Sequence, residues 1–253
     1  MGEDGLMEVE FYQSAPATSA LELQGPPQAT VAIYDSMWNR VALDSSSSKR
    51  VSTGADSLWV ALNRVVVEPG RYLYVVRLDI PGHRALSGKN LLLTSYSGSR
   101  LDLSGVILGT PSPPGWTGRI RGGLDILPRP SLTFRPGEII SVFFEIYGLK
   151  KDTWGERRYS ERVTVSVTEK TGRKLGGILN VFKFWGRRQQ AKSLTLSFDR
   201  QAAGTEGLVE EYFEIDTSQL VTGNYQLKLE VEDQSSGMKR DVTWFFDLES
   251  AGE

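Results

Sequence analysis

The sequence has no cysteine and only one histidine in 253 residues. Without cysteine there are no disulfides, no zinc sites built on thiolates and no cysteine nucleophiles. His83 follows Pro81 and Gly82, which favours an exposed hairpin tip over a catalytic position. No G-x-S-x-G motif is present to hold a nucleophilic serine. The sequence therefore predicts no enzyme, no metal site and no cofactor.

Long apolar runs are missing as well, because no segment approaches the roughly 20 apolar residues of a membrane-spanning helix. The opening MGEDGLMEVEF lacks the basic and apolar parts of a signal peptide. A removed export signal would leave a similar start, so this argues only weakly for the cytoplasm. With 40% hydrophobic and 24% charged residues, we expect a folded, soluble chain without a membrane span of its own.

Helical periodicity is scarce, whereas alternation with a period of two recurs along the whole chain. Turn signals such as Pro69-Gly70 and Pro136-Gly137 separate the alternating sets. This pattern predicts an all-β protein of antiparallel sandwiches with little helix. The clearest sets are Tyr72, Tyr74, Val76 and Leu78; Ile140, Val142, Phe144 and Ile146; Val163, Val165 and Val167; and Tyr225, Leu227, Leu229 and Val231.

One phrase occurs twice, as PGRYLYVVRLD at 69–79 and TGNYQLKLEVED at 222–233. In immunoglobulin-like sandwiches a late strand often begins with a tyrosine whose hydroxyl bonds back to the backbone, and Tyr72 and Tyr225 fit that position. We therefore expect two tandem immunoglobulin-like β-sandwich domains. The alternative is two unrelated hairpins that share common turn chemistry.

Prolines and glycines concentrate in GTPSPPGWTGRIRGG, which predicts an N-terminal domain at 1–112, a linker at 113–128 and a C-terminal domain at 129–253. Residues 113–192 hold 16 basic and 7 acidic side chains, whereas residues 193–253 hold 4 and 13. The two blocks either neutralise each other across one sandwich or form a basic patch for an anionic partner. Nucleic acid is not expected, because the isoelectric point is about 5.7 and the basic residues do not interleave with aromatics.

Three tryptophans lie beside glycine or basic residues, outside the alternating sets. Aromatic side chains flanked by arginine are enriched at the centres of protein interfaces. They could instead cover the open ends of their own domains, and Trp116 could pack between the two sandwiches. The candidate partner-binding residues are Trp116, Trp154, Arg157, Arg158, Trp185, Arg187 and Arg188.

Paired carboxylates are the remaining enzymatic option, in LVEEYFEID at 208–216. On a strand, Glu210, Tyr212, Glu214 and Asp216 share one face. We interpret this face as the solvated side of a half-buried strand. A glycosidase or calcium site there is the alternative.

Four segments share a pattern of short strands and turns: MEVEFYQSAPATSAL, LDLSGVILG, RGGLDILPRPSLTFRPGEIISVFFEIYGL and the segment that begins with Tyr212. Together they resemble the β-rich region of bacterial GWxTD-domain proteins. The signature itself is missing, because Gly115-Trp116-Thr117-Gly118 lacks its aspartate. The resemblance implies a periplasmic or cell-envelope protein and supplies no catalytic residues.

These observations predict a non-catalytic scaffold or extrinsic subunit that braces a protein partner, such as a membrane-associated complex. The alternative is a carbohydrate-binding module that stacks sugars on Trp116, Trp154 and Trp185.

Overall fold

The computed structural model describes residues 5–17, 25–53, 56–80, 82–96, 100–113, 116, 125–168, 193–202 and 208–250. Every regular element in these ranges is a β-strand. None of the residues described forms a helix that could cross a membrane. Contacts divide the chain into two compact units: Met1–Ser95 with Ser112–Pro130, and Tyr96–Pro111 with Ser131–Glu253. The predicted linker, 113–128, lies within the second segment of the first unit.

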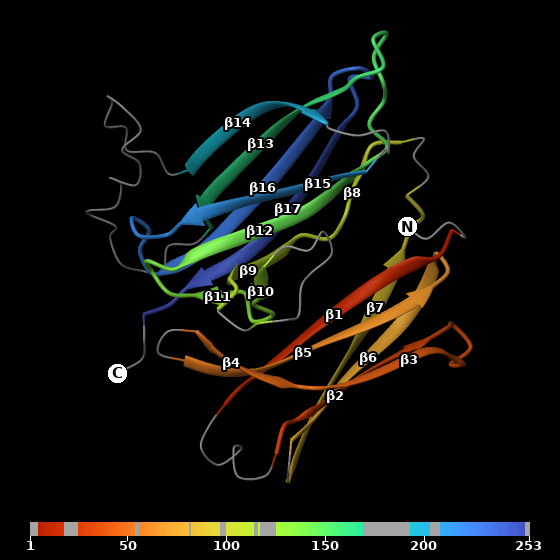
Figure 1. Cartoon of the computed structure of the whole chain (residues 1–253), viewed down its shortest axis with the longest axis vertical. Coiled ribbons are helices and arrows are strands. Elements are labelled where there is room, and N and C mark those ends of the chain that lie inside the picture. Colours follow the sequence, from red (N-terminus) through yellow and green to blue (C-terminus); the bar gives the residue numbers. More distant parts are fainter. Residues whose placement is uncertain are drawn as a thin grey trace. The chain divides into compact units, whose positions relative to one another are not determined.

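The first unit, here called the first sandwich, contains two antiparallel sheets (Figure 1). One sheet has the order β1 (Met7–Pro16), β5 (Asp56–Val67) and β4 (Lys49–Thr53). The other has the order β3 (Arg40–Ser47), β2 (Gln28–Tyr34), β6 (Gly70–Ile80) and β7 (His83–Leu93). The short strand β10 (Ile126–Pro128) follows in the later segment of this unit.

The second unit, the second sandwich, also has two sheets. In one, β12 (Ile139–Tyr147) pairs with β8 (Asp102–Leu103), β9 (Ile107–Pro111) and β15 (Leu208–Asp216). The other has the order β11 (Thr133–Phe134), β17 (Lys239–Leu248), β16 (Gly223–Asp233), β13 (Arg157–Val167) and β14 (Ser193–Ala202). All its pairs are antiparallel except β11 with β17.

The two sandwiches share one pairing scheme. β1 pairs with β5 as β12 pairs with β15, and β2 pairs with β6 as β13 pairs with β16. The β2–β3 and β6–β7 pairs likewise match β13–β14 and β16–β17. This arrangement, with its two tyrosine corners, is immunoglobulin-like. The predicted all-β fold with two tandem sandwiches is therefore confirmed.

Both repeated tyrosines form the predicted corner. The Tyr72 hydroxyl donates to the Glu68 carbonyl at 2.9 Å, and the Tyr225 hydroxyl donates to the Val221 carbonyl at 2.8 Å. Each bond reaches back four residues and fixes the entry of the chain into the strand that follows.

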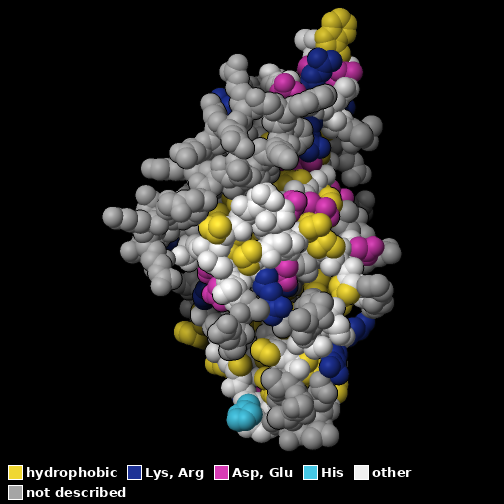
Figure 2. All heavy atoms as spheres, turned by 90° about the vertical axis from the view of Figure 1, so that its left-hand side faces the viewer, with side chains coloured by type: hydrophobic (Ala, Val, Ile, Leu, Met, Phe, Trp, Pro, Cys, Tyr) yellow, Lys and Arg dark blue, Asp and Glu magenta, His cyan; other side chains and the backbone are white. Residues whose placement is uncertain are grey.

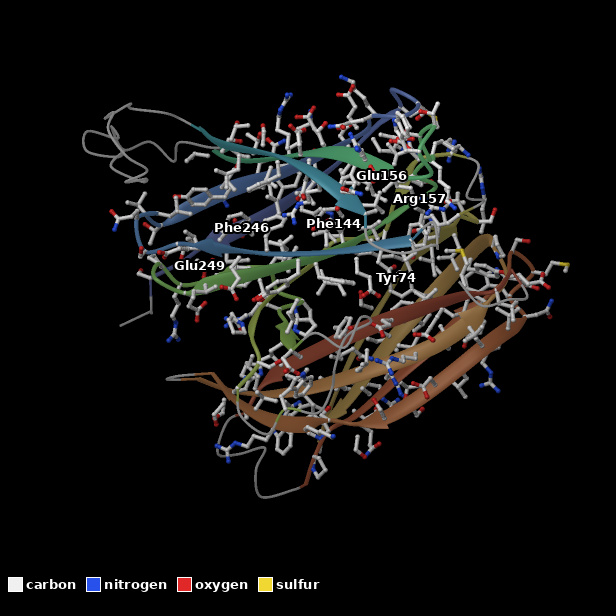
Figure 3. The ribbon with its side chains drawn as sticks, turned by 45° about the horizontal axis from the view of Figure 1, so that its top comes forward. Tyr74, Phe144, Glu156, Arg157, Phe246 and Glu249 are labelled. Atoms are coloured by element: carbon white, nitrogen blue, oxygen red, sulfur yellow. The ribbon has the colours of Figure 1, made fainter. Side chains whose placement is uncertain are left out.

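The second sandwich holds the largest hydrophobic cluster among the described residues. Phe144, from β12, and Phe246, from β17, have no more than 1% of their surface exposed and lie between the sheets (Figure 3). Burial of each such ring contributes about 1.5–3 kcal/mol. Every second side chain of β16 is buried in the same core, as the period of two predicts: Tyr225, Leu227, Leu229 and Val231.

Candidate partner-binding site

The turn between β12 and β13 is organised by a single carboxylate. Asp152 Oδ1 accepts hydrogen bonds from the backbone N–H of Trp154 at 2.8 Å and of Glu156 at 2.9 Å. The Asp152 N–H donates to the Glu156 carbonyl at 2.7 Å, and the Gly155 N–H donates to the Asp152 carbonyl at 3.1 Å. Gly155 has a φ of +81°, a conformation that glycine adopts without strain. Because these bonds fix the backbone, they set the direction in which the side chain between them leaves the turn.

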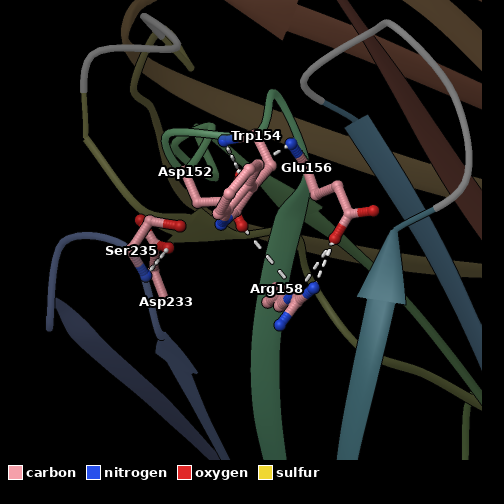
Figure 4. Close-up of polar contacts among 6 residues, drawn as sticks. All are labelled: Asp152, Trp154, Glu156, Arg158, Asp233 and Ser235. Carbon is pink, nitrogen blue, oxygen red and sulfur yellow. Dashed lines mark hydrogen bonds and ion pairs between the residues drawn. The ribbon is translucent and has the colours of Figure 1, made fainter.

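That side chain is Trp154, with 83% of its surface exposed. Arg158, on the following strand, contacts Glu156 Oε2 through Nη2 at 2.5 Å and lies 3.8 Å from Asp152 Oδ2 through Nε (Figure 4). The pKa of the Arg158 guanidinium is raised, mainly by its hydrogen bond to Glu156 and to a smaller extent by the negative charges of Glu156 and Asp152. Arg157 Nε donates to the Leu149 carbonyl at 3.2 Å. The structure thus brings together Trp154, Arg157 and Arg158 of the predicted set.

The turn between β16 and β17 braces this end of the sandwich. Asp233 Oδ2 accepts from the Lys150 N–H at 3.1 Å, and Oδ1 accepts from the Ser235 N–H at 3.0 Å. The Gln234 N–H donates to the Arg158 carbonyl at 2.9 Å. Asp233 is completely buried. Hydrogen bonds therefore tie the two turns together at the end of the sandwich that carries the exposed Trp154, and Figure 4 shows residues of both turns.

The first sandwich carries the same kind of turn between β2 and β3. Asp35 Oδ1 accepts from the N–H groups of Met37 and Asn39, both at 2.8 Å, and the Trp38 N–H donates to the Asp35 carbonyl at 3.1 Å. Met37 is 75% exposed and Trp38 71%. Hydrogen bonds from Asn39 lower the pKa of the Asp35 carboxyl. The sequence interpretation missed this turn, although DSMWNR and DTWGER place an aspartate the same distance before an arginine.

The other predicted partner-binding residues are placed differently. Trp116 is half-buried and packs against the cluster of Val51, Val60 and Leu127 in the first sandwich. Trp185, Arg187 and Arg188 lie outside the described residues. Their part in a binding surface stays a prediction.

A buried ionic cluster joins the two sheets of the second sandwich. Arg200 Nε, on β14, lies 3.2 Å from Glu161 Oε2, and Arg200 Nη1 lies 3.4 Å from Glu211 Oε2. The Tyr159 hydroxyl donates to Glu211. The Glu161 carboxyl oxygens accept no hydrogen bond of good geometry among the described residues. Burial, and then the charge of Glu211, raises the pKa of Glu161 to about 7.

This raised pKa predicts a stability that falls as the pH rises from about 4.5 to about 7. Within this window unfolded Glu161 ionises while the folded carboxyl keeps its proton, so unfolding becomes more favourable. At about 1.4 kcal/mol per pKa unit the loss is roughly 3 kcal/mol, and Glu161→Gln should remove it. Urea unfolding at a series of pH values measures the slope.

The hydrogen bond from Arg84 lowers the pKa of Asp79. Ionisation of Asp79 therefore makes the protein more stable as the pH rises, and it does so below the range of pH 4.5 to 7 in which Glu161 acts. An equal slope in the wild type and in Glu161→Gln would contradict the assignment to Glu161.

The residues considered for catalysis are exposed on strands. Glu210, Tyr212, Glu214 and Asp216 are exposed on one face of β15, in agreement with the interpretation as a solvated side. His83 is exposed at the start of β7, and Figure 2 shows the histidine in cyan at the surface. Among the residues that the structure describes, no group of three or more His, Cys, Asp or Glu side chains is arranged to hold a metal.

No family model matches the chain, and no curated protein matches it. Similar solved structures include a Corynebacterium diphtheriae protein described as membrane anchored, with 14% identity and a TM-score of 0.24, covering 99% of this chain. This chain covers 60% of that protein. The C-terminal domain of the Streptococcus agalactiae AgI/II polypeptide BspA is also similar, with 9% identity, a TM-score of 0.26 and coverage of 96% and 93%. A further BspA_C_WT structure has 10% identity, a TM-score of 0.28 and coverage of 96% and 94%. At these values the matches carry no argument about function.

Proposed function

We propose that the chain is a non-catalytic binding protein, a tandem β-sandwich scaffold or extrinsic subunit that braces a larger protein complex. The observation that carries this proposal is the 83% exposed Trp154, held on a turn whose backbone is fixed by Asp152. A large aromatic side chain in water is unfavourable, and a turn whose backbone is already fixed lowers the entropy that binding must remove. Such a residue suits the centre of a protein interface.

The charges around Trp154 support a protein partner. Arg158 is paired with Glu156, so the turn offers an apolar ring beside an ion pair. Interfaces between proteins commonly place an aromatic and an arginine together in this way. The cell envelope is the proposed location, and it rests on the resemblance to GWxTD-domain proteins alone.

The test is the affinity of the polypeptide that co-purifies from envelope membranes for purified variants of the chain. Trp154→Ala should weaken binding by at least about thirtyfold, the equivalent of roughly 2 kcal/mol for a central aromatic anchor. Phe245→Ala is the matched control, because Phe245 is an aromatic side chain with 57% exposure in the middle of β17. Unchanged affinity in a folded Trp154→Ala variant would exclude this turn as the binding site.

The exposed ring of Trp154 also suits stacking on a sugar, which is the second candidate function. Binding on a glycan array, with quenching of tryptophan fluorescence that is lost in Trp154→Ala, would favour this candidate. Trp116 offers a poorer platform than the sequence interpretation assumed, because it is half-buried.

A further inference from the structure

The two sandwiches differ by one strand. In the first, the chain passes from β3 to β5 through residues 48–55 and forms β4, which pairs with the edge of β5 away from β1. In the second, only residues 203–207 separate β14 from β15. Among the described strands, β15 pairs with β12 alone and nothing corresponds to β4. The other edge of β15, here called its free edge, therefore pairs with none of the described residues.

The strand β4 shows what this position does when it is filled. Its Val51 is only 6% exposed and packs with Val60 of β5 and with Leu127. The added strand thus supplies hydrogen bonds to the β5 edge and closes that side of the apolar core.

In the second sandwich no described strand fills the same position. Leu196 and Phe198 of β14 pair with Val163 and Glu161, both buried, so their side chains point toward the core face of the sheet. Nevertheless Leu196 is 38% exposed and Phe198 is 39% exposed. The contact of Arg200 with Glu211 places β14 next to β15. A strand added to the edge of β15 would cover these two apolar side chains, as β4 closes the first core.

The negative charge of β15 indicates which kind of strand could bind to its free edge. Glu210, Glu214 and Asp216 line its outer face, and none of them forms an ion pair with a described residue. A second copy of β15 laid against the first would place these carboxylates together, which is unfavourable. A strand with Lys or Arg on its outer face and apolar side chains on its inner face would be complementary.

We propose that the free edge of β15 binds an extended segment of a partner protein in which apolar and basic residues alternate. The segment extends the sheet of β12 and β15 through backbone hydrogen bonds. Its apolar side chains cover Leu196 and Phe198, and its basic side chains pair with Glu210 and Glu214. This surface is separate from the Trp154 turn, so the proposal does not depend on that site.

The test uses a fluorescent eight-residue peptide that alternates valine and lysine, with both ends blocked. Fluorescence anisotropy should show saturable binding to the full chain, and hydrogen exchange should slow in β15. The double variant Glu210→Gln/Glu214→Gln should weaken binding at least about fivefold, because two exposed ion pairs are lost. Both side chains are exposed, so the variant should fold.

A peptide of the same composition with its valines and lysines in separate blocks is the control for charge alone. Equal binding of the block peptide, or protection of amides elsewhere than β15, would overturn the proposal, and so would an absence of binding. Trp154→Ala should leave peptide binding unchanged. Failure of this proposal is therefore distinguishable from failure of the proposed function.

Discussion

Replacing Arg200 with alanine is expected to lower the free energy of unfolding of the second sandwich by about 3–5 kcal/mol at pH 8. Arg200 is the cation between Glu161 and Glu211, whose side chains are 0% and 7% exposed. Without it, two carboxylates of like charge remain buried next to each other, and each must be desolvated or take up a proton. Urea unfolding, monitored by hydrogen exchange of the amides in β13 and β15, measures the lost free energy of unfolding of the second sandwich.

The matched control is Lys239→Ala, because Lys239 Nζ lies 2.8 Å from Glu232 Oε2 and both side chains are exposed. That pair should contribute less than about 1 kcal/mol. If Arg200→Ala costs no more than Lys239→Ala, the cluster does not hold the two sheets together.

Gly148→Ala is expected to destabilise the second sandwich by about 3 kcal/mol or more. Gly148 has a φ of +73°, and a Cβ atom there would lie 2.1 Å from the carbonyl oxygen of Arg100. The left-handed conformation alone costs about 1–2 kcal/mol for a residue with a side chain. The clash adds more, because the atom in the way belongs to the backbone and cannot rotate aside.

Gly155→Ala separates the two contributions. Gly155 has a φ of +81°, but a Cβ atom there meets nothing within 4 Å. This variant should cost only the about 1–2 kcal/mol of the left-handed conformation and fold normally. Thermal unfolding of both variants measures the difference, and an equal effect would show that the contact with Arg100 is unimportant.

The strands were predictable because alternation is a local property of the sequence. Alternating apolar residues predict a strand with one buried face without reference to any other segment. The structure buries all four residues of one such set, Tyr225, Leu227, Leu229 and Val231. The tyrosine corners were predictable for the same reason, since the bond from Tyr72 reaches back only to Glu68.

The candidate site was predictable only in part. Trp154 attracts notice because glycine and basic residues surround it. The conformation of its turn, however, depends on backbone hydrogen bonds to the carboxylates of Asp152 and Asp233 that the composition does not reveal. Trp38 was overlooked because it precedes an alternating strand and its exposure depends on a turn with a φ of +67°.

Interactions between distant segments were not predictable. Arg200 meets Glu161 and Glu211 only because β14 lies beside β13 and against β15. No periodicity within one segment carries that information. The free edge of β15 is likewise visible only when the pairing of the two sandwiches is compared.

The most direct test of the central claim is chemical cross-linking and mass spectrometry on the tagged chain captured from its own cells in mild detergent. A binding protein that uses the Trp154 turn should give cross-links from Lys150 or Lys151 to one stoichiometric polypeptide. These cross-links should disappear in Trp154→Ala and persist in Phe245→Ala. A monomer with no cross-linked protein, or the same cross-links in Trp154→Ala, would contradict the account.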